Sequence, residues 1–261
     1  NMWNFNKIKK SLHQNGYYEF KNYLSKSELE KIKKSLVETL NYIHPSNQKD
    51  LQKKYYEVKK FNNKLKGNWY DICKYNIDLL GHLHKREMVD FVKKFFSSKV
   101  VFSGRPAIHA HDNANDRLLH AHQETNQFAR DTIVLWIPLF DTNQKTGGLQ
   151  IYERSHKNGY YKHSLEHPTL GKKAWTSKYT HINKKYLKGL KIKNLKVKAG
   201  NGIIFLSSLV HSGYENSDHK SVRITITERF NPLKKIPYLK NEKAPMKMPY
   251  VGLDYNKLGI S

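Results

Sequence analysis

Cysteine is almost absent from this sequence of 261 residues, because Cys73 is the only one. A single thiol excludes a disulfide within the chain and is typical of a protein in a reducing compartment. No apolar run approaches the roughly 18 residues that a membrane-spanning helix needs, and we expect no secretory leader ahead of Met2. We therefore predict a cytoplasmic protein, built as one large domain whose core draws on 17 Tyr and 11 Phe.

Acidic residues are scarce as well: 22 Asp and Glu stand against 47 Lys and Arg, which gives a net charge of +25 at pH 7. Arginine accounts for 7 of these 47 basic residues. Such a charge attracts polyanions and steers anionic ligands. Proteins that recognise a base sequence rely on Arg for bidentate contacts, and Arg is scarce here. The Lys runs at 7–10 and 31–34 have helical spacing, and such runs usually form the solvent-exposed face of a helix. We expect a small, anionic partner molecule rather than nucleic acid or a membrane, in an oligomeric state that the sequence leaves open.

The hydrophobic pattern divides the chain near residue 98. Before it, helical spacing predominates; Ser25 and Glu28 form a capping-box pattern, and the apolar positions that follow predict a helix that ends before Pro45. From Lys99 the period changes to two, which indicates strands, and the continuous apolar run 132–139 predicts a strand buried on both faces. We interpret residues 1–98 as a helical flank, 99–232 as a β core, and 233–261 as a C-terminal tail. The aromatic and His-rich stretch 160–195 is predicted to be a lid inserted in the core.

Two imidazoles and a carboxylate lie within five residues, at 120–124. On a strand, alternation places His120, His122 and Glu124 on one face, where a His and a carboxylate two residues apart can bind one metal ion. A third ligand is offered by His211, at the end of an apolar, strand-like run. Two His and one carboxylate are the facial triad of non-haem Fe(II) oxygenases, which leaves positions open for co-substrate and dioxygen. Whether His120 or His122 is the ligand stays open on spacing alone.

Arg223 lies twelve residues beyond His211, in an alternating stretch that reads as a strand. A buried Arg on a strand needs an anion, and a carboxylate bound by two hydrogen bonds is its best partner. A dicarboxylate such as 2-oxoglutarate could place one carboxylate on the metal and the other on this arginine. The alternative is an arginine at a solvent-exposed edge of the sheet.

At this point the chain resembles the phytanoyl-CoA dioxygenase family of Fe(II)/2-oxoglutarate-dependent oxygenases. The resemblance is carried by blocks spread over most of the sequence, at 15–25, 122–124, 136–141, 147–149, 155–159, 200–205, 211 and 216–223. It implies a mainly β fold with flanking helices, whose core is a double-stranded β-helix, also called a jelly-roll or cupin-like core. It also favours His122 over His120 as a ligand.

The resemblance implies that His122, Glu124 and His211 hold Fe(II) and that Arg223 binds 2-oxoglutarate, assisted by a hydroxyl such as Thr225 or Ser212. Glu124 departs from the family pattern, which usually has Asp. Glu is one methylene longer but can still ligate iron; a small residue there would instead have suggested a halogenase.

Other residues are expected to shape the pocket. Trp136 should line it, and Arg105, His109 and Trp175 are candidates for contact with the substrate. His109 and His111 are expected to line the site or support the metal ligands rather than bind the metal themselves. The predicted reaction is hydroxylation, or a related oxidation, of an unactivated carbon, which consumes dioxygen and yields succinate and CO2. Two alternatives remain: a JmjC-type protein hydroxylase, which typically anchors 2-oxoglutarate with Lys, and a basic binding module without enzymatic activity.

Overall fold

The computed structural model describes residues 2–104, 106–112, 120–125, 129–164, 181–218 and 220–240. Arg105, Trp175, the middle of the predicted lid and most of the C-terminal tail lie outside the described residues, so the predictions made for them stay predictions. Among the described residues, no helix combines the length and the apolar character needed to cross a bilayer.

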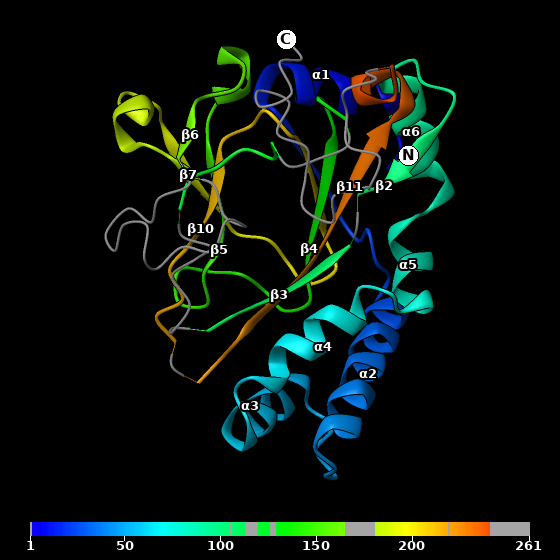
Figure 1. Cartoon of the computed structure of the whole chain (residues 1–261), viewed down its shortest axis with the longest axis vertical. Helices are drawn as coiled ribbons and strands as arrows, with labels where there is room; N and C mark the ends of the chain where they lie inside the picture. Colours follow the sequence, from blue (N-terminus) through cyan, green and yellow to red (C-terminus); the bar gives the residue numbers. More distant parts are fainter. Residues whose placement is uncertain are drawn as a thin grey trace.

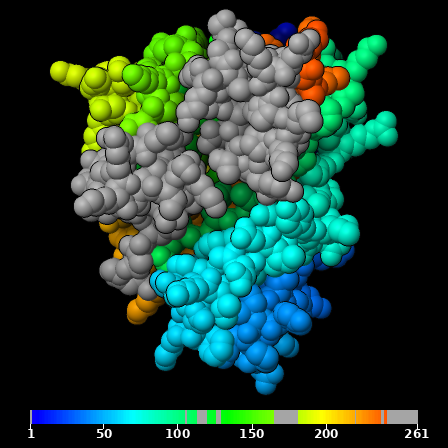
Figure 2. Space-filling model, viewed as in Figure 1, coloured from blue at the N-terminus to red at the C-terminus, as the bar shows by residue number. Residues whose placement is uncertain are grey.

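Six α-helices occupy the first part of the chain. In Figure 1, α1 lies at the top, α6 at the upper right, and α2, α3 and α4 at the bottom, which is the blue and cyan part of the surface in Figure 2. They are α1 (Phe5–Asn15), α2 (Lys26–Ile43), α3 (Leu51–Phe61), α4 (Leu65–Cys73), α5 (Ile77–Leu83) and α6 (Arg86–Phe95). Local signals explain their ends, since Asn4, Ser25, Asp50 and Asn76 each cap a helix N-terminus by accepting a hydrogen bond from a backbone N–H three residues on. Cys73 is buried in this layer, and burial raises the pKa of its thiol to about 11.

The capping box predicted for α2 is confirmed. The Glu28 N–H donates to Ser25 Oγ at 3.2 Å, and the Ser25 N–H donates to Glu28 Oε2 at 2.7 Å. Burial raises the pKa of the Glu28 carboxyl, but hydrogen bonds from Ser25 and Lys85 outweigh it and hold that pKa at about 2.

Replacing Ser25 with alanine should lower the free energy of unfolding by about 1 kcal/mol, because one donor at the start of α2 loses its partner. Urea denaturation followed by circular dichroism measures this change. Ser27→Ala, in the first turn of the same helix but outside the capping box, is the matched control; an equal loss in both variants would contradict the role of the cap.

The larger sheet has the strand order β1-β9-β4-β11-β2, with β3 also paired to β11. Its strands are β1 (Tyr17–Phe20), β2 (Val101–Ser103), β3 (Ala107–His111), β4 (Ile133–Pro138), β9 (Gly202–Leu206) and β11 (Arg223–Pro232). The smaller sheet has the order β10-β5-β8, from β5 (Gly148–Tyr152), β8 (Ile192–Leu195) and β10 (His211–Tyr214). A short pair, β6 (His163–Ser164) with β7 (His181–Ile182), lies at the edges of the predicted lid.

The two faces of the larger sheet have different partners. Ile133, Leu135 and Ile137 of β4 pack into the core shared with the helices. Val134 and Trp136, on the opposite face, pack instead with residues of β5 and β8 in the space between the two sheets. Because both faces are buried, the strand is apolar at every position from 133 to 138. The predicted mainly β, cupin-like fold with flanking helices is confirmed, and candidate site residues lie on its interior face.

Candidate metal and co-substrate site

His122, Glu124 and His211 come together at one end of the space between the sheets. One possible ligand atom from each lies within 4.8 Å of the others. Residues 120–125 do not form the regular strand that we expected. Instead, His122 makes an isolated bridge to His211, with N–H···O distances of 2.9 and 3.0 Å, and the Glu124 N–H donates to the Ser207 carbonyl at 3.0 Å. These backbone contacts bring the two parts of the cluster together.

Both imidazoles of the cluster are oriented by their own chain. His122 Nδ1 lies 2.9 Å from the His120 carbonyl, and His211 Nδ1 lies 2.9 Å from the Leu209 carbonyl. A carbonyl oxygen only accepts, so each Nδ1 donates this hydrogen bond, which orients the ring toward the cluster. Burial, with the neighbouring His211 next in importance, lowers the pKa of His122 to about 3, which keeps that ring neutral at pH 7. A ring that is held through its second nitrogen is the usual arrangement of a metal-binding histidine.

The carboxylate of the cluster is held by an arginine that the sequence reasoning did not single out. Arg229 Nη2 donates to Glu124 Oε1 at 2.9 Å, and Arg229 Nε donates to Oε2 at 3.3 Å. Burial raises the pKa of the Glu124 carboxyl, but the charge of Arg229 and contacts with His211 hold it well below the usual value. The signal was present in the sequence: Arg223, Thr225, Thr227 and Arg229 alternate along β11, so all four share one face.

Arg223 is a buried cation with one donor group left without a partner. It is 4% exposed, and burial lowers the pKa of its guanidinium to about 10. Its Nη1 donates to the Gly148 carbonyl at 2.8 Å, whereas its buried Nε has no hydrogen-bond partner. No carboxylate in the described part of the chain pairs with it. An uncompensated buried charge is costly, which favours a site for a bound carboxylate.

Gly147 allows the chain to pass close to this guanidinium. Its φ of +71° lies in the left-handed region that favours glycine. A Cβ at this position would lie 2.7 Å from the Tyr214 carbonyl oxygen and 3.2 Å from Arg223 Nη1. The Gly-Gly pair at 147–148 is therefore part of the arginine's binding environment, and not merely a turn.

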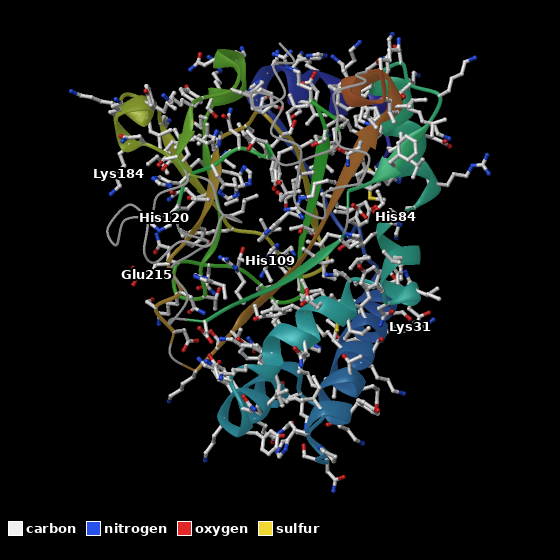
Figure 3. The ribbon with its side chains drawn as sticks, in the orientation of Figure 1. Lys31, His84, His109, His120, Lys184 and Glu215 are labelled. Atoms are coloured by element: carbon white, nitrogen blue, oxygen red, sulfur yellow. The ribbon has the colours of Figure 1, made fainter. Side chains whose placement is uncertain are left out.

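The remaining predicted pocket residues divide between two locations. Thr225 and Trp136 lie on the interior face, and His109 pairs with Thr225 across β3 and β11 at the centre of the molecule (Figure 3). Burial, followed by the charge of Arg229, lowers the pKa of His109 to about 4, so its ring is neutral. Ser212 adjoins His211 on β10, where alternation directs it to the opposite face, and it donates to Gln150 Oε1 at 3.1 Å. Its contact with 2-oxoglutarate stays a prediction.

His120, the alternative ligand, is directed elsewhere. Its ring lies beside that of His181, with 6.1 Å between the ring centroids. His111 pairs with Arg223 in the β3–β11 ladder. Neither belongs to the metal-ligand group found among the described residues.

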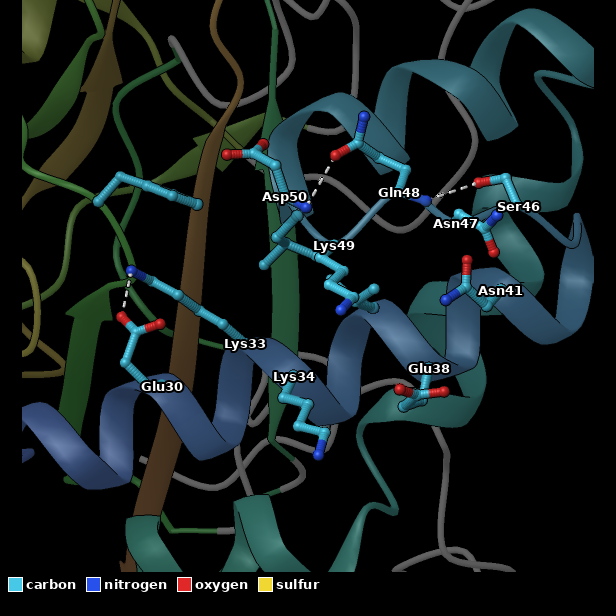
Figure 4. A pocket seen from close by; sticks show the side chains of 13 residues that line it. Glu30, Lys33, Lys34, Glu38, Asn41, Ser46, Asn47, Gln48, Lys49 and Asp50 are labelled. Atoms are coloured by element: carbon cyan, nitrogen blue, oxygen red, sulfur yellow. Dashed lines mark hydrogen bonds and ion pairs between the residues drawn. The ribbon is translucent and has the colours of Figure 1, made fainter.

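A separate hollow lies on the helical side, between α2 and the segment that leads into α3 (Figure 4). Lys33 donates to Glu30 at 3.0 Å within it and lies over the Phe140 ring at 4.7 Å from the centroid. None of the cluster residues lines this hollow. Because these charged groups already contact one another and the hollow lies outside the sheets, we do not assign it to the reaction.

The fold has a cupin-like core, and its His-Glu-His cluster could hold a metal ion. The family model for phytanoyl-CoA dioxygenase matches residues 12–224. The chain belongs to this family, and it is a 2-oxoglutarate-dependent oxygenase that uses iron, which excludes the binding module without enzymatic activity. No curated protein matches the chain in a sequence search.

Solved structures with a similar fold include three proteins with low sequence identity. EctD from S. alaskensis, solved with 2-oxoglutarate and 5-hydroxyectoine, is 13% identical, with a TM-score of 0.59 over 88% of this chain and 76% of that chain. The epimerase SnoN, solved with Fe3+, alpha ketoglutarate and nogalamycin RO, is 12% identical, with a TM-score of 0.55 over 95% of this chain and 97% of that chain. AviO1 from Streptomyces viridochromogenes Tue57 is 15% identical, with a TM-score of 0.53 over 94% and 99%. At these identities the likeness concerns the fold.

Proposed function

We propose that His122, Glu124 and His211 hold the iron of this oxygenase and that Arg223 anchors the distal carboxylate of 2-oxoglutarate. The observation that carries the proposal is the pairing of two features inside one core. One is a His-Glu-His cluster whose possible ligand atoms lie within 4.8 Å of one another, and the other is a buried guanidinium whose Nε has no hydrogen-bond partner. The donor set suits iron, which prefers imidazole and carboxylate ligands in this arrangement.

Iron, when bound with 2-oxoglutarate and dioxygen, supplies an oxidant able to remove hydrogen from an unactivated carbon, with succinate and CO2 as co-products. The chain's own residues supply binding, orientation and exclusion of water. The carbonyls of His120 and Leu209 fix the two imidazole planes. Arg223 determines how the co-substrate lies. Thr225, which is buried and lies two residues along the same face, donates its hydroxyl to the same carboxylate in this proposal.

We further propose that the substrate is a small anionic metabolite whose oxidised carbon lies near the cluster. The net charge of +25 supports this class, because it raises the local concentration of anions. Trp136 and His109 give the pocket an apolar wall and a neutral ring. Arg105 and Trp175 are further candidates for substrate contact.

An anaerobic titration of metal-free protein, first with Fe(II) and then with 2-oxoglutarate, tests the site. We expect the weak visible charge-transfer band of the iron–2-oxoglutarate chelate to appear at equimolar co-substrate. Iron-loaded, folded protein that gives no band would contradict the proposed site.

The substrate class is tested separately, by measuring succinate release in air. Anionic candidates should stimulate it above the background without substrate, whereas neutral analogues of matched size should not. If neutral compounds stimulate succinate release as strongly, the anionic class is wrong while the site assignment stands.

A further inference from the structure

We propose that Arg229 is a positioning residue for the metal ligand Glu124 and that it makes glutamate, rather than the family's usual aspartate, the required ligand in this chain. This inference rests on the proposed role of Glu124 as an iron ligand. It concerns how the carboxylate is held, and it predicts that the family-typical residue will work poorly here.

Each of the three guanidinium nitrogens of Arg229 has a hydrogen-bond partner. Nε and Nη2 bind the two oxygens of Glu124 side by side, and Nη1 donates to Thr227 Oγ1 at 2.7 Å. The two charged side chains are 15% and 10% exposed. A planar guanidinium held in this way fixes the plane of the carboxylate as well as its position.

The backbones on both sides of this contact are held by hydrogen bonds, which limits how far either can move to follow a shorter side chain. Arg229 lies in β11, where it pairs with Val134 of the central strand β4. The Glu124 N–H is bound to the Ser207 carbonyl. Glu124 Oε1 lies 3.7 Å from His211 Nε2, which shows that the carboxylate reaches the cluster and Arg229 at the same time.

Aspartate at position 124 would end one carbon–carbon bond, roughly 1.5 Å, sooner. The Arg229 Nε–Oε2 distance is already 3.3 Å, near the limit of a hydrogen bond. A shortened carboxylate could therefore serve the metal or the arginine but not both. An arginine aimed at a carboxylate that cannot reach it would remain a buried, unpaired cation beside the metal.

Charge and geometry predict opposite effects when Arg229 is removed. If the arginine were only a nearby positive charge, its loss would strengthen binding of a divalent cation. If it positions Glu124, its loss should weaken metal binding about 10- to 100-fold, the usual effect of removing a group that orients a metal ligand. Arg229→Lys separates the two, because it keeps the charge but cannot bind both oxygens side by side.

The test uses Co(II), whose visible spectrum reports both affinity and coordination, in protein without iron. We expect Arg229→Met and Arg229→Lys to weaken Co(II) binding about 10- to 100-fold, with altered visible bands. The control is Arg86→Met on α6, where the side chain is 91% exposed, and it should bind as the wild type does. Tighter or unchanged binding in Arg229→Lys would overturn the proposal even if Arg229→Met failed to fold.

A double-mutant cycle tests the link between the two residues. Glu124→Asp should weaken Co(II) binding about tenfold or more when Arg229 is present, but should have little further effect in the Arg229→Met background. Equal effects in both backgrounds would overturn the inference that the pair acts as a unit. Failure of the wild type to bind Co(II) would instead contradict the proposed iron site, so the two failures are distinguishable.

Discussion

His211→Ala should abolish the iron–2-oxoglutarate chelate band and reduce succinate formation about a thousandfold. The imidazole supplies one of three proposed ligands, and its Nδ1–H donates to the Leu209 carbonyl, so Nε2 is already directed for binding. Loss of the metal removes several kcal/mol of stabilisation of the reaction's transition state, and each 1.4 kcal/mol corresponds to a factor of ten. Anaerobic titration and a succinate assay measure the two effects.

The control for this variant is His13→Ala, which removes an exposed imidazole of α1 that is stacked on Phe95. It should keep the band and the rate, because the hydrogen bond between residues 13 and 156 uses the backbone carbonyl of His13. A band that persists in His211→Ala would show that another residue is the third ligand. His120, beside His181, would then be the next candidate to replace.

The helical flank could be predicted in part because its signals are local. The capping box at 25–28 and the three-to-four spacing after it are complete within α2. Further along, α4 ends at Cys73 and α5 begins at Ile77, where the Asn76 side chain accepts from the Leu79 N–H. Asparagine favours helix starts, so this signal was also local, although it competes with an aromatic and aliphatic run that reads as continuous.

The sequence predicts those residues of the candidate site whose positions depend on spacing along one strand. It does not predict the contacts that depend on the register between segments far apart in the chain. The pattern at 122–124 and the alternation at Arg223 are local features. The contact of Arg229 with Glu124 joins residues 105 positions apart, and it depends on how β11 pairs with its neighbours. Likewise, residues 120–125 have the alternation of a strand but do not join a continuous ladder. They form one isolated bridge to His211 and one hydrogen bond to Ser207. Short apolar and polar patterns do not reveal such long-range pairing.

Arg223→Met should raise the dissociation constant of 2-oxoglutarate about 10- to 100-fold while leaving Co(II) binding unchanged. The loss corresponds to hydrogen bonds with a charged partner, which contribute about 1.5–3 kcal/mol. A JmjC-type scheme, in which lysine anchors the co-substrate, gives Arg223 no such role and predicts no change. Isothermal titration calorimetry of metal-loaded protein measures both constants, and Arg86→Met on the exposed face of α6 is the matched control.

The same variant should be at least as stable as the wild type when 2-oxoglutarate is absent. Arg223 is buried with Nε unpaired, and replacing such a charge with an apolar side chain of similar length removes a desolvation cost. Added 2-oxoglutarate should then raise the melting temperature of the wild type, since a ligand that binds only the folded state stabilises it, and should raise that of Arg223→Met much less. A variant that melts well below the wild type and responds equally to 2-oxoglutarate would show that the arginine serves the fold. A variant that is at least as stable as the wild type but responds little to 2-oxoglutarate would show that the fold retains an unfavourable buried charge because the co-substrate requires it.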